Sequence, residues 1–351
     1  MVALDLVNAS NAQLRELGPG LVALFVGGTS GIGAFTLKTF VKDTVSPRVY
    51  LVGRSAPAAE RIIKECEGLN KDGKVEFLRA DVSELNEVDR VCKEIQKREK
   101  KINLLVQSQG NFSLAGRQEN PEGLDRKMTL NFYGRMRFIY NLNPLLQNAT
   151  ASTPNFARSL SILGSGAEGV VNFEDLDLEK EYSGMRCANH TIVMNDFMTN
   201  EFASREPSVS YIHSNPGVVN TGLSRGLPWY ARYALKAATP LLWPFFTSAE
   251  ETGSRQLFLA TSALYPPGKA ADGSAFSSGV PAPQGLSTVK GADEKVGSGG
   301  YILHYTGEST GKKILQEYRE KGASKTVWEH TIGVFEGLVK NNHGKGSTVG
   351  S

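Results

Sequence analysis

The chain has 351 residues, of which 40% are hydrophobic and 21% are charged, and its formal net charge is +3. This ordinary composition predicts a globular protein with a substantial core. The small net charge, with no lysine- and arginine-rich stripe, argues against nucleic acid as a partner.

The three cysteines, Cys66, Cys92 and Cys187, show neither the spacing of a disulfide framework nor that of a metal site. They favour a reducing compartment, and we expect a cytoplasmic protein with no bound metal. The N-terminal segment contains Asp5 and no unbroken apolar stretch, so no secretory signal is expected. The apolar stretch over residues 234–246 contains two prolines and is too short to span a bilayer.

The first predicted elements are a short helix, a strand and a second helix. Residues 10–13 resemble a capping box, which indicates a short helix before the first strand. Residues 21–26 are continuously apolar and predict a buried strand, and residues 34–41 have the apolar period of a helix. The strand and the second helix are joined directly by a glycine-rich turn.

This turn, Gly-Gly-Thr-Ser-Gly-Ile-Gly over residues 27–33, has the pattern of a dinucleotide-phosphate site. Gly27 allows the tight turn, Gly31 lets the backbone approach a pyrophosphate, and Gly33 lets the helix pack closely on the strand. The N-terminus of the helix then presents free N–H groups to the phosphates. The turn residues that we expect to hold the cofactor are Gly27, Thr29, Ser30, Gly31, Ile32 and Gly33.

Strands and helices alternate along the next part of the chain. Further strands are predicted at residues 48–52, 75–78, 102–106, 159–163 and 209–213, and helices at 58–69, 86–100, 122–146 and 185–203. This alternation predicts a doubly wound parallel α/β sheet. We expect one domain over residues 1–265.

The chain changes character after residue 265. Residues 271–300 are rich in glycine, serine and proline and predict a long loop. Residues 312–322 and 327–339 predict helices, with fraying from residue 341. We therefore expect residues 266–351 to form a loop and C-terminal helices that pack on the main domain.

The end of the second predicted strand bears on the choice of cofactor. An acidic residue about 20 positions past the glycine turn would bind a ribose 2′-hydroxyl, but this strand ends Val52-Gly53-Arg54-Ser55. Arg54 can stack on adenine and meet a 2′-phosphate, and Ser55 can donate to it. This pattern favours NADP(H) over NAD(H), and the alternative is a solvated surface arginine.

The chain carries these motifs in the order typical of the short-chain dehydrogenase/reductase family, which it resembles over residues 20–265. This resemblance implies a Rossmann-type fold. The glycine turn matches, although Val26 replaces the usual threonine before it. Asn131 and Gly134 match the family's Asn-x-x-Gly motif. Residues 107–110 stand where the family usually has Asn-Asn-Ala-Gly, and only the last of them, Gly110, is identical. The further cofactor-binding residues that the resemblance implies are Asp81, Val82, Ser108, Gln109, Gly110, Pro216, Gly217, Val219 and Thr221.

The resemblance also implies a catalytic set of Tyr, Lys, Ser and Asn. Ser165 matches the serine that polarises the substrate carbonyl, and Asn131 matches the asparagine that holds a relay water. Tyr182 and Arg186 have the i, i+4 spacing of the catalytic Tyr and Lys. Arginine keeps the positive charge but holds its proton too tightly to relay it. Ser165 could also be an ordinary turn serine, and Asn131 could support a helix kink.

A second alignment exists for the Tyr and Lys positions. Residues 173–182 resemble an insertion of retinol-dehydrogenase-like members, in which Tyr182 would lie outside the active site. The catalytic Tyr position would then fall on Ala188 and the Lys position on Ile192, and neither can move a proton. His190, between these positions, is a substitute acid to consider, although a lone helix histidine is usually a packing or surface residue.

A lid over the substrate is expected at residues 222–247, where two of the three tryptophans lie. Its apolar, aromatic composition suits a bulky apolar ligand such as a polyketide, terpenoid or sterol. The rings could instead pack on the C-terminal extension, or contact a membrane surface with Arg225, Arg232 and Lys236 facing the headgroups. Family members often dimerise through two long helices. A homodimer is therefore one of the oligomeric states that the sequence leaves open.

These expectations favour an NADP(H)-dependent oxidoreductase of a bulky apolar carbonyl or alcohol. The incomplete catalytic set leaves a non-redox alternative open, in which a retained cofactor shapes a cyclisation, isomerisation or dehydration. A non-catalytic cofactor-binding protein is the third hypothesis.

Overall fold

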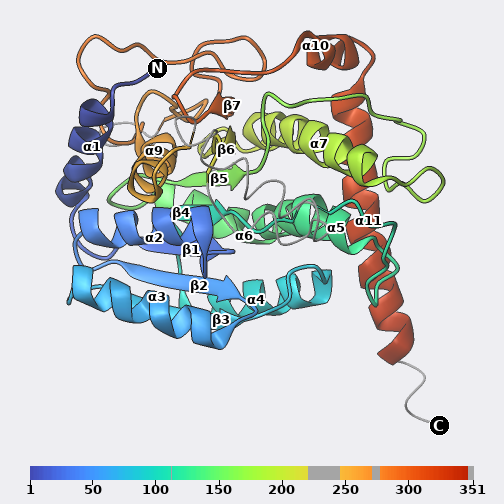
Figure 1. The fold of residues 1–351 in the computed structure, drawn as a ribbon, viewed down its shortest axis with the longest axis horizontal. Helices are drawn as coiled ribbons and strands as arrows, with labels where there is room; N and C mark the ends of the chain where they lie inside the picture. The colour runs from blue at the N-terminus through green and yellow to red at the C-terminus, as the bar shows by residue number, and fades with distance from the viewer. Residues whose placement is uncertain (112, 220–245, 271–276, 347–351) are drawn as a thin grey trace.

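The computed structural model describes residues 1–111, 113–219, 246–270 and 277–346, the side chains up to residue 339. Its centre is a parallel seven-stranded sheet in the order β3-β2-β1-β4-β5-β6-β7, as the Rossmann-type expectation requires (Figure 1). The strands are β1 Val22–Val26, β2 Arg48–Gly53, β3 Lys74–Arg79, β4 Leu104–Gln107, β5 Arg158–Ile162, β6 Ser210–Asn215 and β7 Gly300–His304.

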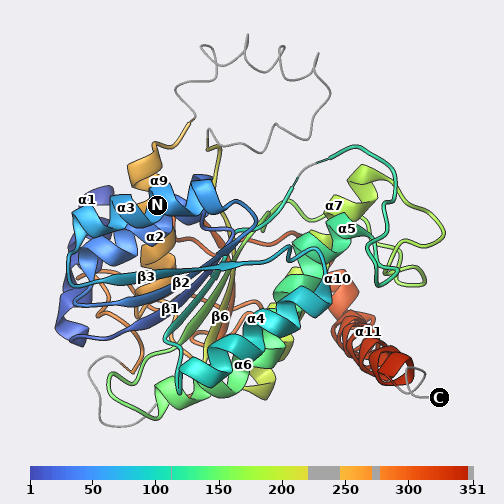
Figure 2. The ribbon, with the colours of Figure 1, turned by 90° about the horizontal axis from the view of Figure 1, so that it is seen from below.

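Helices cover both faces of the sheet (Figure 2). The helices are α1 Leu4–Ala12, α2 Gly31–Asp43, α3 Ala56–Leu69, α4 Leu85–Arg98, α5 Arg126–Met128, α6 Gly134–Thr150, α7 Gly184–Arg205, α9 Ala249–Thr261, α10 Lys313–Glu320 and α11 Ala323–Gly346. A 3₁₀ turn, Gln13–Leu17, follows α1, and a π-helical turn, Thr129–Tyr133, joins α5 to α6.

Alternation along the central strand builds one core on each face, because successive side chains of a strand point to opposite sides. Val22, Leu24 and Val26 pack in the core with α4, α6, α7 and α11. Ala23 and Phe25 pack in the core with α1, α2, α3 and α9. This pattern explains why β1 is continuously apolar, since both of its faces are buried.

The first helix differs from its prediction. The helix α1 begins at Leu4 after Ala3, and Ser10 lies buried near its end instead of capping a later helix. Packing on α9 accounts for this, because Asn11 Nδ2 donates to Ser254 O at 2.9 Å. The capping-box interpretation was therefore wrong, although a short helix does precede β1.

The long helix predicted over residues 122–146 begins later and ends later. Asp125 sets the start, because its side chain accepts hydrogen bonds from the N–H groups of Lys127 and Met128. Pro144 lies inside α6 and does not end it. Buried side chains on both sides of the proline, among them Phe138 and Leu146, outweigh the one hydrogen bond that proline cannot donate.

The C-terminal region contributes a strand that the sequence did not predict. β7 pairs in parallel with β6 from Tyr211↔Gly300 to Asn215↔His304. The helices α10 and α11 form where helices were expected, and α11 continues to Gly346, past the expected fraying at residue 341. The extension therefore completes the sheet as well as covering α7.

Within the described ranges, no helix has both the length and the apolar composition that a bilayer span requires.

Candidate functional site at the carboxyl ends of the strands

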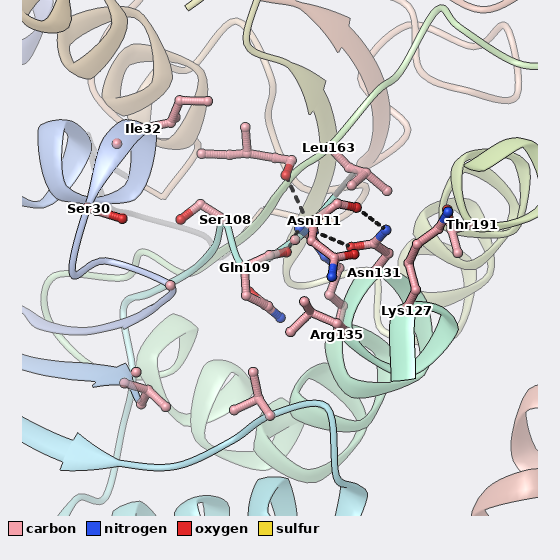
Figure 3. Close-up of a pocket in the computed structure, with 18 of the residues that line it drawn as sticks. Ser30, Ile32, Ser108, Gln109, Asn111, Lys127, Asn131, Arg135, Leu163 and Thr191 are labelled. Carbon is pink, nitrogen blue, oxygen red and sulfur yellow. Dashed lines mark hydrogen bonds between the residues drawn. The ribbon is translucent and has the colours of Figure 1, made fainter. Parts of the chain in front are cut away.

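A pocket of about 500 Å³ opens where the strand order reverses between β1 and β4 (Figure 3). Parallel α/β sheets bind their ligands at this kind of position. One end of the pocket, here called the Arg54 end, is lined by Val52, Gly53, Arg54, Ala80, Asp81 and Val82. The other, here called the α7 end, is lined by Lys127, Leu130, Asn131, Ile162, Leu163, Gly164, Ala188, Thr191, Ile192 and Pro216.

The glycine turn lies between these two ends, and its geometry fits a dinucleotide. A Cβ on Gly27 would lie 2.5 Å from Gln109 N, and one on Gly33 would lie 2.1 Å from Ser108 Oγ. The helix α2 begins at Gly31, and Ser30 makes no side-chain cap, so the first amides of the helix are open to a phosphate. Thr29, Ser30, Gly31 and Ile32 line the pocket beside Gly27, whereas Gly33 lets the first turn of α2 lie close to Ser108 and to the backbone of Gly27 and Gly28.

At the Arg54 end, an arginine and a carboxylate face each other. Arg54 is 71% exposed, and its Nη1 lies 3.9 Å from Asp81 Oδ2. The same Asp81 oxygen accepts a hydrogen bond from Arg126 Nη2 at 3.0 Å. Ser55 caps α3 by accepting from Ala58 N at 3.4 Å, and it is not among the described lining residues. Arg54 is thus exposed at this end and makes a long ion pair with Asp81, whose closer partner is Arg126.

The middle of the pocket is lined by Ser108, Gln109 and Gly110, above a buried arginine. Arg135 is fully buried and donates to the carbonyl oxygens of Gln107 and Ile162 at 3.2 and 3.0 Å. It also donates to Gln109 O. Burial lowers the pKa of Arg135 to about 9. The sequence reasoning missed this residue, although its place directly after Gly134 of the Asn-x-x-Gly motif was a usable signal.

Asn131 lines the α7 end of the pocket. It lies in the π-helical turn, where its Nδ2 donates to Asn111 O and its Oδ1 accepts from Asn111 N, both at 3.2 Å (Figure 3). Its own carbonyl accepts from Asn195 Nδ2 of α7 at 3.1 Å. These bonds fix Asn131 between the loop after β4 and α7.

Ser165 does not reach the lining. Its side chain is fully buried, and its Oγ donates to Leu303 O of β7 at 2.5 Å. Leu163 and Gly164 line the pocket at this point. A Cβ on Gly164 would lie 2.9 Å from Ile192 Cδ1, so these two residues are in contact at the α7 end.

Tyr182 lies just before α7 and Arg186 lies in its first turn, and neither is among the described lining residues. The Tyr182 hydroxyl donates to Asp125 Oδ1 at 3.3 Å, and burial together with nearby Cys187 and Asp125 raises its pKa far above the ordinary tyrosine value. Arg186 is exposed and pairs with Glu181. The structure therefore does not bring Tyr182, Arg186 and Ser165 together with Asn131.

Ala188 and Ile192, the positions of the second alignment, do line the pocket. His190, between them, points elsewhere: it is buried, its Nε2 accepts from Asn172 N at 3.2 Å, and burial lowers its pKa. Lys127 is a lining residue that the sequence reasoning missed. Its place one helical turn before Asn131 was the signal that could have found it.

The motif after β6 is only partly described. Pro216 lines the pocket, and Gly217 has a φ of +74°, with Tyr305 filling the space where a Cβ would lie. Val219 forms a bridge with Thr247. Thr221 and most of the expected lid, residues 222–245, fall outside the described residues.

Comparisons with known proteins agree with this geometry. The family model described as short chain dehydrogenase matches residues 21–153. "Oxidoreductase AN1596" of Emericella nidulans is 39% identical over 97% of this chain and 99% of its own. "Short-chain dehydrogenase/reductase SAT2" of Stachybotrys chartarum is 30% identical over 97% of this chain and 99% of its own. The chain belongs to the short-chain dehydrogenase/reductase family.

A solved structure extends this agreement to the fold. The "Pseudomonas aeruginosa RhlG/NADP active-site complex" aligns with a TM-score of 0.52 at 20% identity, over 69% of this chain and 89% of that one. Membership of the short-chain dehydrogenase/reductase family supports an oxidoreductase function with a nicotinamide cofactor. The C-terminal region that ends in α11 extends beyond the shared fold.

Proposed function

We propose that this protein is an NADP(H)-dependent oxidoreductase of a bulky, apolar carbonyl or alcohol. One observation carries the proposal: a single pocket runs from the glycine turn to α7, and a basic side chain stands at its outer end. The family relatives named as oxidoreductases support the reaction class.

The cofactor contacts follow from the pocket lining. The turn from Gly27 to Ile32, with the N-terminus of α2, would hold the pyrophosphate. Arg54 would bind the 2′-phosphate of NADP(H), and Asp81 with Val82 would border the adenine. The nicotinamide would then lie at the α7 end near Pro216, where it would give or take a hydride.

The lining of the α7 end supports the proposed substrate class. Leu130, Ile162, Leu163, Ala188 and Ile192 give this end an apolar wall. Asn131 and Lys127 are the polar side chains there that can orient a ligand oxygen. This combination suits a largely apolar molecule with one carbonyl or hydroxyl group.

The test follows NADPH absorbance with a panel of apolar ketones, trans-1-decalone first, and repeats it with NADH. We expect NADPH consumption matched by formation of the alcohol, and little reaction with NADH. Purified protein that shows no affinity for NADPH or NADP⁺ would contradict the proposal at its first step.

A second candidate function rests on two residues that line the α7 end. Ala188 and Ile192 line the pocket, and on the second alignment they occupy the Tyr and Lys positions, so on that alignment the site has no Tyr/Lys proton relay. A cofactor retained there could shape a reaction without net redox change. Product that forms while NADPH absorbance stays constant would favour this candidate over hydride transfer.

The two alignments of the catalytic pair are separated by one variant. Tyr182→Phe removes the hydroxyl that bonds to Asp125 but leaves the ring packed. On the Ala188/Ile192 alignment, which we favour, kcat changes by less than about 3-fold, whereas loss of a general acid costs about 100-fold or more. A loss of the larger size would place Tyr182 and Arg186 in the reaction.

A further inference from the structure

We propose that Lys127 binds the substrate oxygen and supplies its proton, in place of the tyrosine that position 188 lacks. The inference rests on the proposed function and names the group that completes its chemistry.

The first support is the way the ammonium is held. Lys127 is only 6% exposed, and its Nζ donates to Ser113 O and to Gly184 O, each at 2.8 Å. Figure 3 shows the side chain extending from α5 toward α7. An ammonium has three donors, so two carbonyl bonds fix its position and leave one N–H for a ligand.

The second support is elimination among the ionisable residues of the described lining. These are Arg54, Asp81, Lys127 and Arg135. Arg54 and Asp81 face each other at the opposite end. Arg135 is directed at backbone carbonyls of β4 and β5, and a guanidinium does not give up its proton readily. Among the described lining residues, Lys127 is the ionisable group that remains at the α7 end.

The uncharged polar groups nearby cannot take this role. The Thr191 hydroxyl donates to the carbonyls of Cys187 and Ala188, so its proton is committed to α7. Asn131 is bonded to Asn111 through both of its amide atoms, and an amide has no proton to transfer. Asn131 can orient a substrate oxygen or a water beside Lys127.

The hydrogen bonds described for the Asp125 carboxylate, two positions before Lys127 in the chain, are made with donors other than the ammonium. Asp125 Oδ1 accepts from the backbone N–H groups of Lys127 and Met128 and from the Tyr182 hydroxyl, and its Oδ2 accepts from Gln118 N. Both oxygens are therefore occupied by other donors. Asp125 places Lys127 by capping α5, and it leaves the side chain free to face the pocket.

The step balances in the reducing direction. A bound reduced nicotinamide would supply the hydride to the carbonyl carbon, and the π electron pair would move to oxygen. That oxygen would take a proton from Lys127 Nζ, and the neutral amine would regain a proton from the solvent's proton pool. The overall change is a carbonyl reduced to an alcohol with one hydride and one proton.

Variants of the lysine test this role in the full-length protein with NADPH and trans-1-decalone. In Lys127→Met we expect kcat to fall about 100-fold or more, the usual size of general-acid catalysis, with NADPH affinity changed less than about 3-fold. Lys127→Arg keeps a charge that can bind the oxygen but transfers no proton readily, so KM for decalone stays near wild type while kcat falls. Lys101→Met is the matched control, since Lys101 Nζ also donates to a backbone carbonyl, Thr153 O at 2.9 Å, away from the pocket.

Chemical rescue separates proton donation from a structural role. Primary ammonium ions of different acidity are added to Lys127→Ala, and rescue by a proton donor varies systematically with their acidity. Rescue that is independent of acidity, or wild-type kcat in Lys127→Met, would overturn the proposal.

A measurement without turnover keeps the inference separable from the proposed function. Protein labelled with ¹⁵N-lysine is titrated with NADP⁺ and with NADPH, and the Nζ resonance is assigned by its loss in Lys127→Arg. We expect that resonance to shift between the two complexes, because only the oxidised nicotinamide ring is positively charged. An unchanged resonance overturns the role of Lys127. A shift without turnover of any carbonyl overturns hydride transfer while keeping Lys127 beside the ring.

Discussion

The Ser165 hydroxyl donates to Leu303 O at 2.5 Å and thereby joins the loop after β5 to β7. Asn215 Nδ2 also donates to Ser165 O at 3.0 Å, so the residue is held from β6 and β7 together. Its place is explained by the strand that the C-terminal extension adds. The serine binds the sheet edge, and Gly164 takes the place facing the pocket.

Ser165→Ala is expected to lower the free energy of unfolding by about 1 kcal/mol, because a buried carbonyl loses its donor. We expect hydride transfer to stay within about 3-fold of wild type, since a general catalytic contact would cost far more. Urea denaturation and NADPH oxidation measure the two effects. Ser152→Ala is the control, because Ser152 makes a similar bond to Asn148 O at the surface. Lost hydride transfer at unchanged stability would instead support the catalytic role suggested by the resemblance.

The glycine turn could be recognised from sequence because its pattern lies within residues 27–33. Its packing depends on distant residues, because a Cβ on Gly27 or Gly33 would meet Gln109 or Ser108, which follow β4. The catalytic centre depends on which residue of α7 faces the pocket. That register is set by where α7 begins, and the Ser183 side chain, which accepts from Arg186 N at 3.1 Å, fixes this start after Tyr182.

Arg54 is expected to set the preference for a phosphorylated cofactor. Arg54→Gln removes the exposed cation at the outer end of the pocket, so NADPH affinity should fall about 10- to 100-fold, the size of a charge-assisted hydrogen bond. NADH affinity should change less than about 3-fold, because NADH lacks the 2′-phosphate. Fluorescence titration with both nucleotides measures this.

Arg61→Gln is the control for Arg54, since Arg61 is also an exposed arginine and pairs with Glu65 on α3. Higher ionic strength should weaken NADPH binding more in wild type than in Arg54→Gln. Equal loss of NADPH and NADH affinity in Arg54→Gln would assign Arg54 to the adenine and not to the phosphate.

Gly33→Ala is expected to distort the glycine turn that would hold the pyrophosphate. The new Cβ would lie 2.1 Å from Ser108 Oγ, 3.0 Å from Gly27 O and 3.1 Å from Gly28 Cα. The serine can rotate, but the two backbone atoms must move, and they belong to the turn that would hold the pyrophosphate. We expect NADPH affinity to fall by at least about 10-fold, equivalent to the roughly 1.4 kcal/mol that such a shift would cost.

Gly68→Ala on α3 is the matched control for Gly33→Ala. Its Cβ would meet nothing within 4 Å, so the variant should bind NADPH normally. It should also gain about 0.5–1 kcal/mol of stability, because alanine favours a helix over glycine. Calorimetry and nucleotide titration of both variants check the pair, and normal binding by Gly33→Ala would show that the turn tolerates the shift.

Strand β7 could not be predicted from local sequence patterns. Gly300–His304 is a short apolar run directly after a stretch rich in glycine, serine and proline, and α9, the described helix that precedes it, ends far upstream at Thr261. Pairing with β6 is what makes it a strand, and no local signal carries that long-range pairing. The six earlier strands were predictable because each belongs to a strand–helix alternation.

A buried histidine–carboxyl pair beside Gly164 is expected to make the free energy of unfolding depend on pH. His213 Nδ1 lies 2.6 Å from Asp196 Oδ1, and its Nε2 accepts from Gly164 N at 3.3 Å. Burial lowers the pKa of His213 to about 3, whereas burial and the nearby Glu168 raise the pKa of Asp196 well above its usual range. Burial thus disfavours the charged form of each group in the folded protein.

The two groups contribute to stability with opposite signs. Below pH 6.5 the unfolded chain protonates His213 and the folded chain does not, so this contribution is lost on acidification. Above its ordinary value of 3.8, unfolded Asp196 gives up a proton that the folded protein keeps, so that contribution is lost as pH rises. Between pH 3.8 and pH 6.5 the two contributions change the stability of the wild type in opposite directions and offset each other. Single variants are needed to measure each contribution by itself.

His213→Gln can keep both hydrogen bonds but removes the titration. From pH 7 to pH 5, the wild type should lose about 2 kcal/mol of unfolding free energy relative to this variant. Relative to Asp196→Asn, the wild type should gain stability over the same change. Urea denaturation at both pH values measures the two differences. Slopes of the same sign in both comparisons would mean that the pair is an ion pair in the folded state, with His213 charged behind Gly164.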